Sequence, residues 1–202
     1  MTAVPLQYSK MKVRILKMNK TYKMTIAGLE RELPVCRLND NLCIAGFVIF
    51  GDVELTCACA KALLEKAPEF DYMAAPEAKA IPLIHEMARQ SGRNDYLLAR
   101  KKPKAYMEGV FKTEYTSITT AGTQVLYMDG RDAKKMEGKK ILIIDDVISS
   151  GESLAAMEKL VTEAGGIVAA RMAILAEGNA KDRDDIIFLE PLPLFDGNGE
   201  AL

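Results

Sequence analysis

The segment ILIIDDVISSGES, residues 141–153, constrains the fold of this 202-residue chain more than any other. Its first four residues, 141–144, are apolar and suit a strand that is buried on both faces of a sheet. Two carboxylates, Asp145 and Asp146, follow at the expected end of that strand. Small and hydroxylated residues then lead into a stretch of helical period over residues 154–164. This order predicts an anion-binding loop at a helix start, with a site for hydroxyl groups or a cation beside it.

From residue 53 onward, segments of helical and strand-like pattern alternate. Helices are expected from residue 53 to a stop at Pro68 and over residues 81–90 and 154–164, and strands over residues 71–75, 95–99, 114–120, 123–128, 141–144, 167–175 and 185–189. This alternation predicts an α/β fold with a mostly parallel, twisted sheet and helices on both faces. Ligands of such sheets bind at the carboxyl ends of the strands, where the loops after residues 75, 99 and 144 are expected to meet.

The first quarter of the chain has a different pattern. Strand-like segments over residues 12–16 and 22–26 flank Asn19 and Lys20, where a hairpin turn is expected, and another strand is expected over residues 31–38. We therefore expect a small N-terminal antiparallel β appendage over residues 1–52. Residues 53–202 are expected to form the α/β core with a C-terminal tail.

The composition excludes several classes of function. Hydrophobic residues make up 49% and charged residues 27%, and the net charge of −1 gives no general attraction to nucleic acid or to an anionic membrane. No apolar run approaches the roughly 20 residues that span a bilayer, and the N-terminus lacks the apolar core of a signal peptide. The four cysteines lie between residues 36 and 59 without a second ligand pair, which favours free thiols over a zinc site. A cytoplasmic protein is expected.

Residues 149–153 and the acidic pair suit two parts of one ligand. The loop can offer backbone N–H groups, hydroxyls and a helix N-terminus to one phosphate, and Gly151 permits a close approach of the backbone. Asp145 and Asp146 can accept hydrogen bonds from vicinal hydroxyls and support Mg²⁺ directly or through its waters. The alternative is a purely structural role, in which the acids end a strand and the serines cap a helix.

The same segment resembles the phosphoribosyl pyrophosphate (PRPP) signature of the type I phosphoribosyltransferases, in which an apolar strand and two acids precede a [ST]-G-x-[ST] turn. The resemblance implies that Asp145 and Asp146 hold the ribose hydroxyls, with Mg²⁺ bound through water. It also implies a 5′-phosphate cradle made of Ser149, Ser150, Gly151, Glu152 and Ser153. Glu152 stands where many members have glycine, so its backbone amide is expected to make the contact.

Residues 74–88 are similar to the adenine phosphoribosyltransferase segment in which E-A-R-G follows a strand and binds pyrophosphate. The resemblance gives this role to Glu77, Ala78 and Lys79. Lys79 replaces the usual arginine, which keeps the charge and loses the bidentate fork. The alternative is a charge pair on a solvated surface at the start of a helix.

The basic run over residues 100–104 resembles the R-K-K-G-K start of the mobile active-site loop in the same enzymes. The resemblance implies that its four cations neutralise the pyrophosphate: Arg100, Lys101, Lys102 and Lys104. The alternative to this role is that the basic run is a solvated face or a nucleic-acid patch.

Glu114 and Tyr115 are similar to the E-Y pair of adenine-type enzymes. The resemblance makes Glu114 a candidate proton carrier, and the alternative is that Glu114 is a strand residue without a catalytic role.

Taken together, the resemblance implies a purine phosphoribosyltransferase, a glycosyltransferase of purine salvage, that uses PRPP and Mg²⁺ and forms a homodimer. Adenine is the favoured acceptor. The N-terminal strands are expected to form a hood over the base, and the C-terminal tail over residues 177–195 is the alternative or additional segment that grips it. Xanthine, guanine or hypoxanthine are alternative acceptors. A regulatory protein that senses PRPP without catalysis is the alternative of another class.

Overall fold

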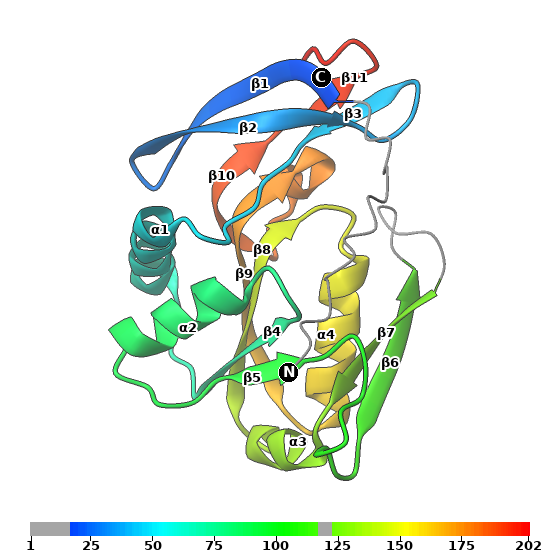
Figure 1. Cartoon of the computed structure of the whole chain (residues 1–202). Helices are drawn as coiled ribbons and strands as arrows, with labels where there is room; N and C mark the ends of the chain where they lie inside the picture. Colours follow the sequence, from blue (N-terminus) through cyan, green and yellow to red (C-terminus); the bar gives the residue numbers. More distant parts are fainter. Residues whose placement is uncertain (1–16, 117–122) are drawn as a thin grey trace, which may run out of the picture.

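A five-stranded parallel sheet forms the centre of the computed structural model, which describes residues 17–116 and 123–202 (Figure 1). Its strand order is β10-β9-β8-β4-β5, and each neighbouring pair is parallel. The strands are β10 (Ile187–Leu192), β9 (Ile167–Glu177), β8 (Lys140–Ile148), β4 (Tyr72–Pro76) and β5 (Leu97–Ala99). The strands β8, β4 and β9 carry long buried apolar runs, as a sheet covered on both faces requires.

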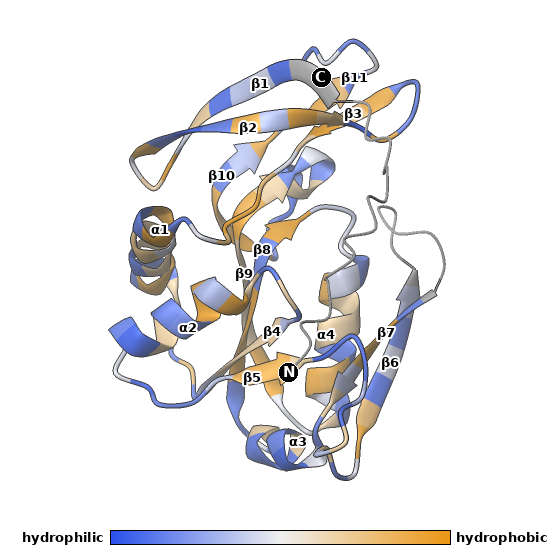
Figure 2. Ribbon diagram, viewed as in Figure 1, coloured by the Kyte–Doolittle hydropathy of each residue, from blue (hydrophilic) through white to orange (hydrophobic). Residues whose placement is uncertain are grey.

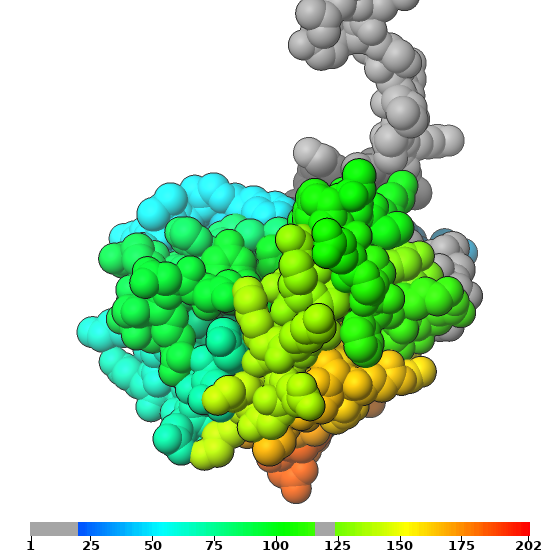
Figure 3. All heavy atoms as spheres, turned by 90° about the horizontal axis from the view of Figure 1, so that it is seen from below, coloured from blue at the N-terminus to red at the C-terminus, as the bar shows by residue number. Residues whose placement is uncertain are grey.

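Helices cover both faces of this sheet. Helices α1 (Val53–Lys66) and α2 (Ile81–Gln90) pack on one face, and α3 (Gly130–Met136) and α4 (Glu152–Glu163) on the other. Side chains alternate along β8, so Leu142 and Ile144 join the core with α1 and α2, whereas Ile141 and Ile143 join the core with α4. Seen from below, α2 and α4 lie on opposite sides with the α3 segment between them (Figure 3). The predicted α/β class and the helices on both faces are confirmed.

A separate antiparallel sheet, called the hood from here on, lies over the carboxyl ends of β8 and β9. It contains β1 (Lys17–Ile26), β2 (Leu29–Arg37), β3 (Leu42–Ala45) and β11 (Leu194–Asp196), in the order β1-β2-β3-β11. The predicted antiparallel sheet is confirmed, and its fourth strand comes from the C-terminal end of the chain (Figure 1). The predicted division at residue 52 stays a prediction.

The turn that was predicted at Asn19 and Lys20 is wrong, because β1 runs through both residues. The chain reverses instead at Ala27 and Gly28, with φ angles of 48° and 82°. Two positive φ angles are typical of the tight turns that join antiparallel strands, and glycine adopts them without strain. The strand that was predicted over residues 12–16 lies outside the described residues.

A two-stranded antiparallel hairpin packs beside α4 and forms no ladder with the central sheet. It consists of β6 (Phe111–Thr116) and β7 (Thr123–Met128), and the turn that was predicted at Ala121 and Gly122 lies outside the described residues. Two backbone hydrogen bonds between Arg100 and Tyr127, of 2.7 and 2.8 Å, tie β7 to the segment after β5. The hairpin is therefore joined to the central sheet at Arg100, the first residue of the basic run 100–104.

Apolar residues are concentrated on the strands of the central sheet, whereas polar residues are frequent on α2, α3 and β1 (Figure 2). Among the described residues, none of the helices combines the length and the apolar character that a bilayer crossing requires.

Candidate active site

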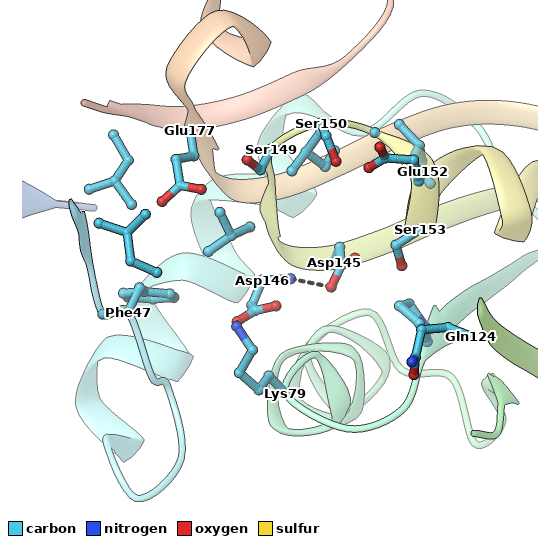
Figure 4. A pocket seen from close by; sticks show the side chains of 18 of the residues that line it. Phe47, Lys79, Gln124, Asp145, Asp146, Ser149, Ser150, Glu152, Ser153 and Glu177 are labelled. Carbon is cyan, nitrogen blue, oxygen red and sulfur yellow. Dashed lines mark hydrogen bonds and ion pairs between the residues drawn. The ribbon is translucent and has the colours of Figure 1, made fainter. Parts of the chain in front are cut away.

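A cavity of about 570 Å³ lies between the carboxyl ends of the central strands and the hood (Figure 4). One half is polar and gathers residues that the sequence singled out: Glu77, Ala78, Lys79, Lys101, Asp145, Asp146, Ser149, Ser150, Gly151, Glu152 and Ser153. The other half is apolar and is lined from the hood and from β10 by Leu38, Leu42, Ile44, Phe47, Leu192 and Leu194. The three predicted loops therefore meet at one site, as parallel strand ends should.

The two acids lie within β8 and not after it. Strand β8 continues to Ile148, and Val147 and Ile148 still pair with Leu175 and Ala176 of β9. The backbone N–H of Asp146 donates a hydrogen bond of 2.9 Å to Asp145 Oδ1. Burial, followed by the negative charge of Asp146, raises the pKa of Asp145 well above its usual range. Ribose hydroxyls or a cation would therefore stabilise the ionised form of Asp145.

Lys79 supplies a positive charge to the second acid. Its Nζ lies 2.6 Å from Asp146 Oδ2, and the side chain of Asp146 is only 5% exposed whereas that of Lys79 is 47% exposed. A buried carboxylate needs such a partner, because an unpaired buried charge is costly. Lys79 thus connects the loop after β4 with the acid pair of β8 and still reaches the open cavity.

The loop over residues 149–153, called the serine loop from here on, lies at the N-terminus of α4, where a small anion is stabilised. Gly151 is the N-cap residue of α4 with a φ of 89°, in the left-handed region that favours glycine. A Cβ atom at this position would also lie 2.6 Å from Arg183 Nη1. The loop therefore brings its backbone and the hydroxyls of Ser149, Ser150 and Ser153 to the start of a 12-residue helix.

Glu77 joins the loop after β4 to the basic run. Its Oε2 accepts a hydrogen bond of 2.9 Å from the N–H of Lys101, and its Oε1 lies 3.2 Å from Arg100 Nη2. Burial favours a higher pKa for Glu77, but the Lys101 N–H and the Arg100 guanidinium outweigh it and hold the pKa below its usual value. Glu77 is therefore a carboxylate that positions two cationic segments.

Comparisons with known proteins identify the family of the chain. Residues 58–189, more than half of the chain, match the phosphoribosyl transferase domain family. The chain belongs to this family. The predicted family and the predicted class of enzyme, a phosphoribosyltransferase, are confirmed.

Individual members of the phosphoribosyl transferase family resemble the chain over about two thirds of its length. It is 33% identical over 141 residues to the adenine phosphoribosyltransferase of Thermoanaerobacter pseudethanolicus, covering 67% of this chain and 68% of that protein. It is 33% identical over 130 residues to the adenine phosphoribosyltransferase of Thermotoga maritima, covering 64% and 66%. The crystal structure of the Thermoanaerobacter pseudethanolicus enzyme superposes with a TM-score of 0.59 and 26% identity, over 71% of this chain and 84% of that one.

Some predicted residues of this phosphoribosyltransferase lie away from the cavity. Arg100 contacts Glu77 without lining the cavity, and Lys102 and Lys104 also lie outside its lining. The side chain of Glu114 is 60% exposed and lies 3.8 Å from Lys112, whereas its neighbour Tyr115 lines the cavity. Adjacent residues of a strand point to opposite sides, so Tyr115 and Glu114 cannot both face the cavity from a regular β6. The roles assigned to these residues stay predictions.

Two side chains of the β6–β7 hairpin face the serine loop. Tyr115 hydrogen-bonds to Ser153, and burial, which this hydrogen bond opposes, raises the pKa of the phenol. Gln124 of β7 lies near Ser153 in Figure 4. The sequence analysis did not single out Gln124, because a lone glutamine in a strand carries no spacing signal.

Glu177, which ends β9, and Phe47, which follows β3, also line the cavity, and neither was singled out individually from the sequence. Glu177 follows the buried apolar run 172–176, just as Asp145 follows the run 141–144. An acid directly after a buried apolar run was therefore a usable signal at both positions.

Proposed function

We propose that this protein transfers the 5-phosphoribosyl group of PRPP to a ring nitrogen of a purine, with adenine preferred, and releases pyrophosphate, as in purine salvage. The observation that carries the proposal is the single cavity in which the serine loop, the acid pair and Lys79 surround a polar half beside an apolar half. The two relatives that are 33% identical are named adenine phosphoribosyltransferases, which supports adenine as the acceptor.

PRPP, the phosphoribosyl donor, fits the polar half of the cavity when its 5′-phosphate lies at the serine loop. Its 5′-phosphate would accept hydrogen bonds from the backbone of residues 149–153 at the start of α4, and its ribose hydroxyls would donate to Asp145 and Asp146. Its pyrophosphate would then lie toward Lys79 and Lys101, whose segments Glu77 holds together. The apolar half remains for the planar base.

The reaction breaks the bond from the anomeric carbon to the pyrophosphate oxygen and forms the bond from that carbon to the purine nitrogen. The anomeric carbon passes through an oxocarbenium-like state, which needs fixed reactants and exclusion of water. The serine loop and the acid pair hold the ribose phosphate, and Lys79 stabilises the departing charge. Pyrophosphate takes the bonding electron pair, and the purine gives up its N–H proton, for which Glu114 stays the predicted carrier.

The carboxylate oxygens of the acid pair suit Mg²⁺ as ligands. The carboxyl groups of Asp145 and Asp146 interact with each other, and the described residues contain no cluster of three or more histidine, cysteine or acidic side chains that could hold a metal by themselves. Mg²⁺ commonly binds in this way, through one or two carboxylates, its own waters and substrate phosphates. When bound, Mg²⁺ would neutralise part of the pyrophosphate charge. The homodimer and the cytoplasmic location stay predictions.

The test combines purified protein, Mg²⁺ and PRPP with adenine, hypoxanthine, guanine or xanthine in separate reactions. Pyrophosphate release is followed, and the nucleotide is identified by its mass. Adenine is expected to give the fastest release together with adenosine monophosphate. Binding of PRPP without release by any of the four bases would contradict the proposal and favour a PRPP sensor.

A further inference from the structure

Glu177 is a buried acid in the half of the cavity that the donor leaves free. It is the last residue of β9 and only 7% exposed, and Figure 4 shows its carboxyl group directed into the cavity between Ser149 and the side chains near Phe47. None of the roles assigned above to the ribose, the phosphate or the pyrophosphate uses this carboxyl group.

The surroundings of Glu177 are mostly apolar. Leu192 of β10 pairs with it in the sheet, and Leu194 and Phe47 line the same part of the cavity. Burial raises the pKa of Glu177, and a hydrogen bond with Ser149 and the positive charge of Lys79 oppose this shift. A buried carboxylate is costly without hydrogen bonds, and it offers about four lone-pair positions, more than one hydroxyl group can fill. The carboxylate of Glu177 can therefore accept further hydrogen bonds on the side that faces the cavity.

The position of the base follows from the position of the donor. With its phosphate on residues 149–153 and its ribose on Asp145 and Asp146, the remaining space is the apolar half between Phe47, Leu192 and Leu194. A planar heterocycle suits these walls, and its polar edge needs a partner there. Glu177 is the acid that this half presents.

We propose that Glu177 determines acceptor specificity by accepting hydrogen bonds from the amino group at C6 of the base, so that a 6-aminopurine is preferred to its 6-oxo analogue. This inference rests on the proposed function. The amino group of adenine donates hydrogen bonds to the carboxylate, whereas O6 of hypoxanthine, bound in the same pose, brings lone pairs against lone pairs. Such a mismatch rejects a substrate more strongly than the loss of an apolar contact does.

The first test needs only the wild-type enzyme. Its kcat/KM is measured at saturating PRPP for adenine, for unsubstituted purine and for hypoxanthine. The expected order is adenine, then purine, then hypoxanthine, because purine lacks the amino donor but brings no oxygen to the carboxylate. Hypoxanthine used better than purine overturns the inference.

The second test uses Glu177→Gln, in which the side-chain amide keeps one acceptor and adds a donor for O6. The ratio of kcat/KM for adenine to that for hypoxanthine is expected to fall by about tenfold or more, with the KM for PRPP within about twofold of wild type. Glu163→Gln makes the same chemical change on the exposed side of α4 and is expected to leave the ratio unchanged.

A purely structural role gives a different result. If Glu177 only holds the serine loop through Ser149, Glu177→Gln changes the KM for PRPP and leaves the preference between the bases unchanged, which overturns the inference. Turnover of adenine by the wild type in that experiment leaves the proposed function intact. Absence of turnover with every base by the wild type overturns the proposed function and this inference together.

Discussion

Asp145 and Asp146 are neighbours in the sequence, but their carboxylates have different surroundings. Asp146 lies 2.6 Å from the ammonium group of Lys79, whereas Asp145 accepts the N–H of Asp146 and lies beside its negative charge. Burial and that charge raise the pKa of Asp145. Hydroxyl donors or a cation relieve the penalty on the ionised form. The pair is thus electrostatically strained until a ligand with hydroxyls or a metal binds.

Glu177 also makes the stability of the folded protein depend on pH. Its pKa in the folded state is raised, mainly by burial, above the value of about 4.3 that an unfolded chain gives to glutamate. The folded state therefore holds the proton more tightly, and the stability that Glu177 contributes is lost as the pH rises from about 4 through the folded pKa. Glutamine has no such dependence.

We therefore expect Glu177→Gln to raise the Tm relative to wild type more at pH 7 than at pH 4. Thermal unfolding followed by circular dichroism at both pH values measures this difference, with Glu163→Gln as the control. An equal Tm difference at the two pH values would show that burial does not shift the pKa of Glu177.

At the scale of elements, the loop after β4 and the basic run act as one unit because Glu77 holds both. The carboxylate accepts the N–H of Lys101 and pairs with Arg100, and the same run is fixed to β7 through Arg100 and Tyr127. A change at Glu77 should therefore alter how pyrophosphate is bound more than how the base is bound.

Glu77→Gln removes the ion pair to Arg100 and weakens the hydrogen bond from Lys101. Because hydrogen bonds to charged groups contribute about 1.5–3 kcal/mol, the KM for PRPP is expected to rise about tenfold or more. The KM for adenine should change little. Glu69→Gln is the matched control, since Glu69 precedes β4 and pairs with Lys140 far along the chain from the loop. Equal changes in both KM values would contradict the assigned role.

The elements that the sequence predicted best have strong local signals. Helix α2 spans residues 81–90 as expected, because its apolar residues recur on one side and Pro82 lies at its start. Helix α3 has only seven residues, and β11 only three, so neither carries enough periodicity to be recognised. The turn at Ala27 was missed because alanine does not signal a positive φ. Strand β8 is longer than predicted because Val147 and Ile148 continue its pairing with β9.

At the scale of the whole molecule, the cavity depends on segments from both ends of the chain. The central sheet and the donor loops followed from the sequence, because strand ends and charged motifs are local. The hood over the cavity could be predicted only in part from the sequence. Its strand β11 pairs with β3 across about 150 residues of chain, and such non-local pairing leaves no local pattern. The candidate donor site was therefore more predictable than the base site, to which Phe47 and Glu177 belong.

Phe195 of β11 packs on β1 across the hood. It is 2% exposed and packs edge-to-face on Tyr22, with ring centroids 5.2 Å apart. Phe195→Leu keeps an apolar side chain and loses the aromatic contact, which is worth about 0.5–1.5 kcal/mol beyond the buried area. A less rigid hood is expected to raise the KM for adenine more than the KM for PRPP. Leu202→Ala is the control, because Leu202 is exposed. A larger effect on PRPP than on adenine would contradict this division of the cavity.

The central claim is that Asp145 and Asp146, beside the serine loop, form the site at which PRPP reacts. The most direct test is pyrophosphate release from PRPP with adenine and Mg²⁺ by the wild type and by the double variant Asp145→Asn with Asp146→Asn. The two side-chain amides keep the shape of the site and remove its charge, so the double variant is expected to unfold cooperatively like the wild type and to show no turnover. Undiminished release by the folded double variant would contradict the account.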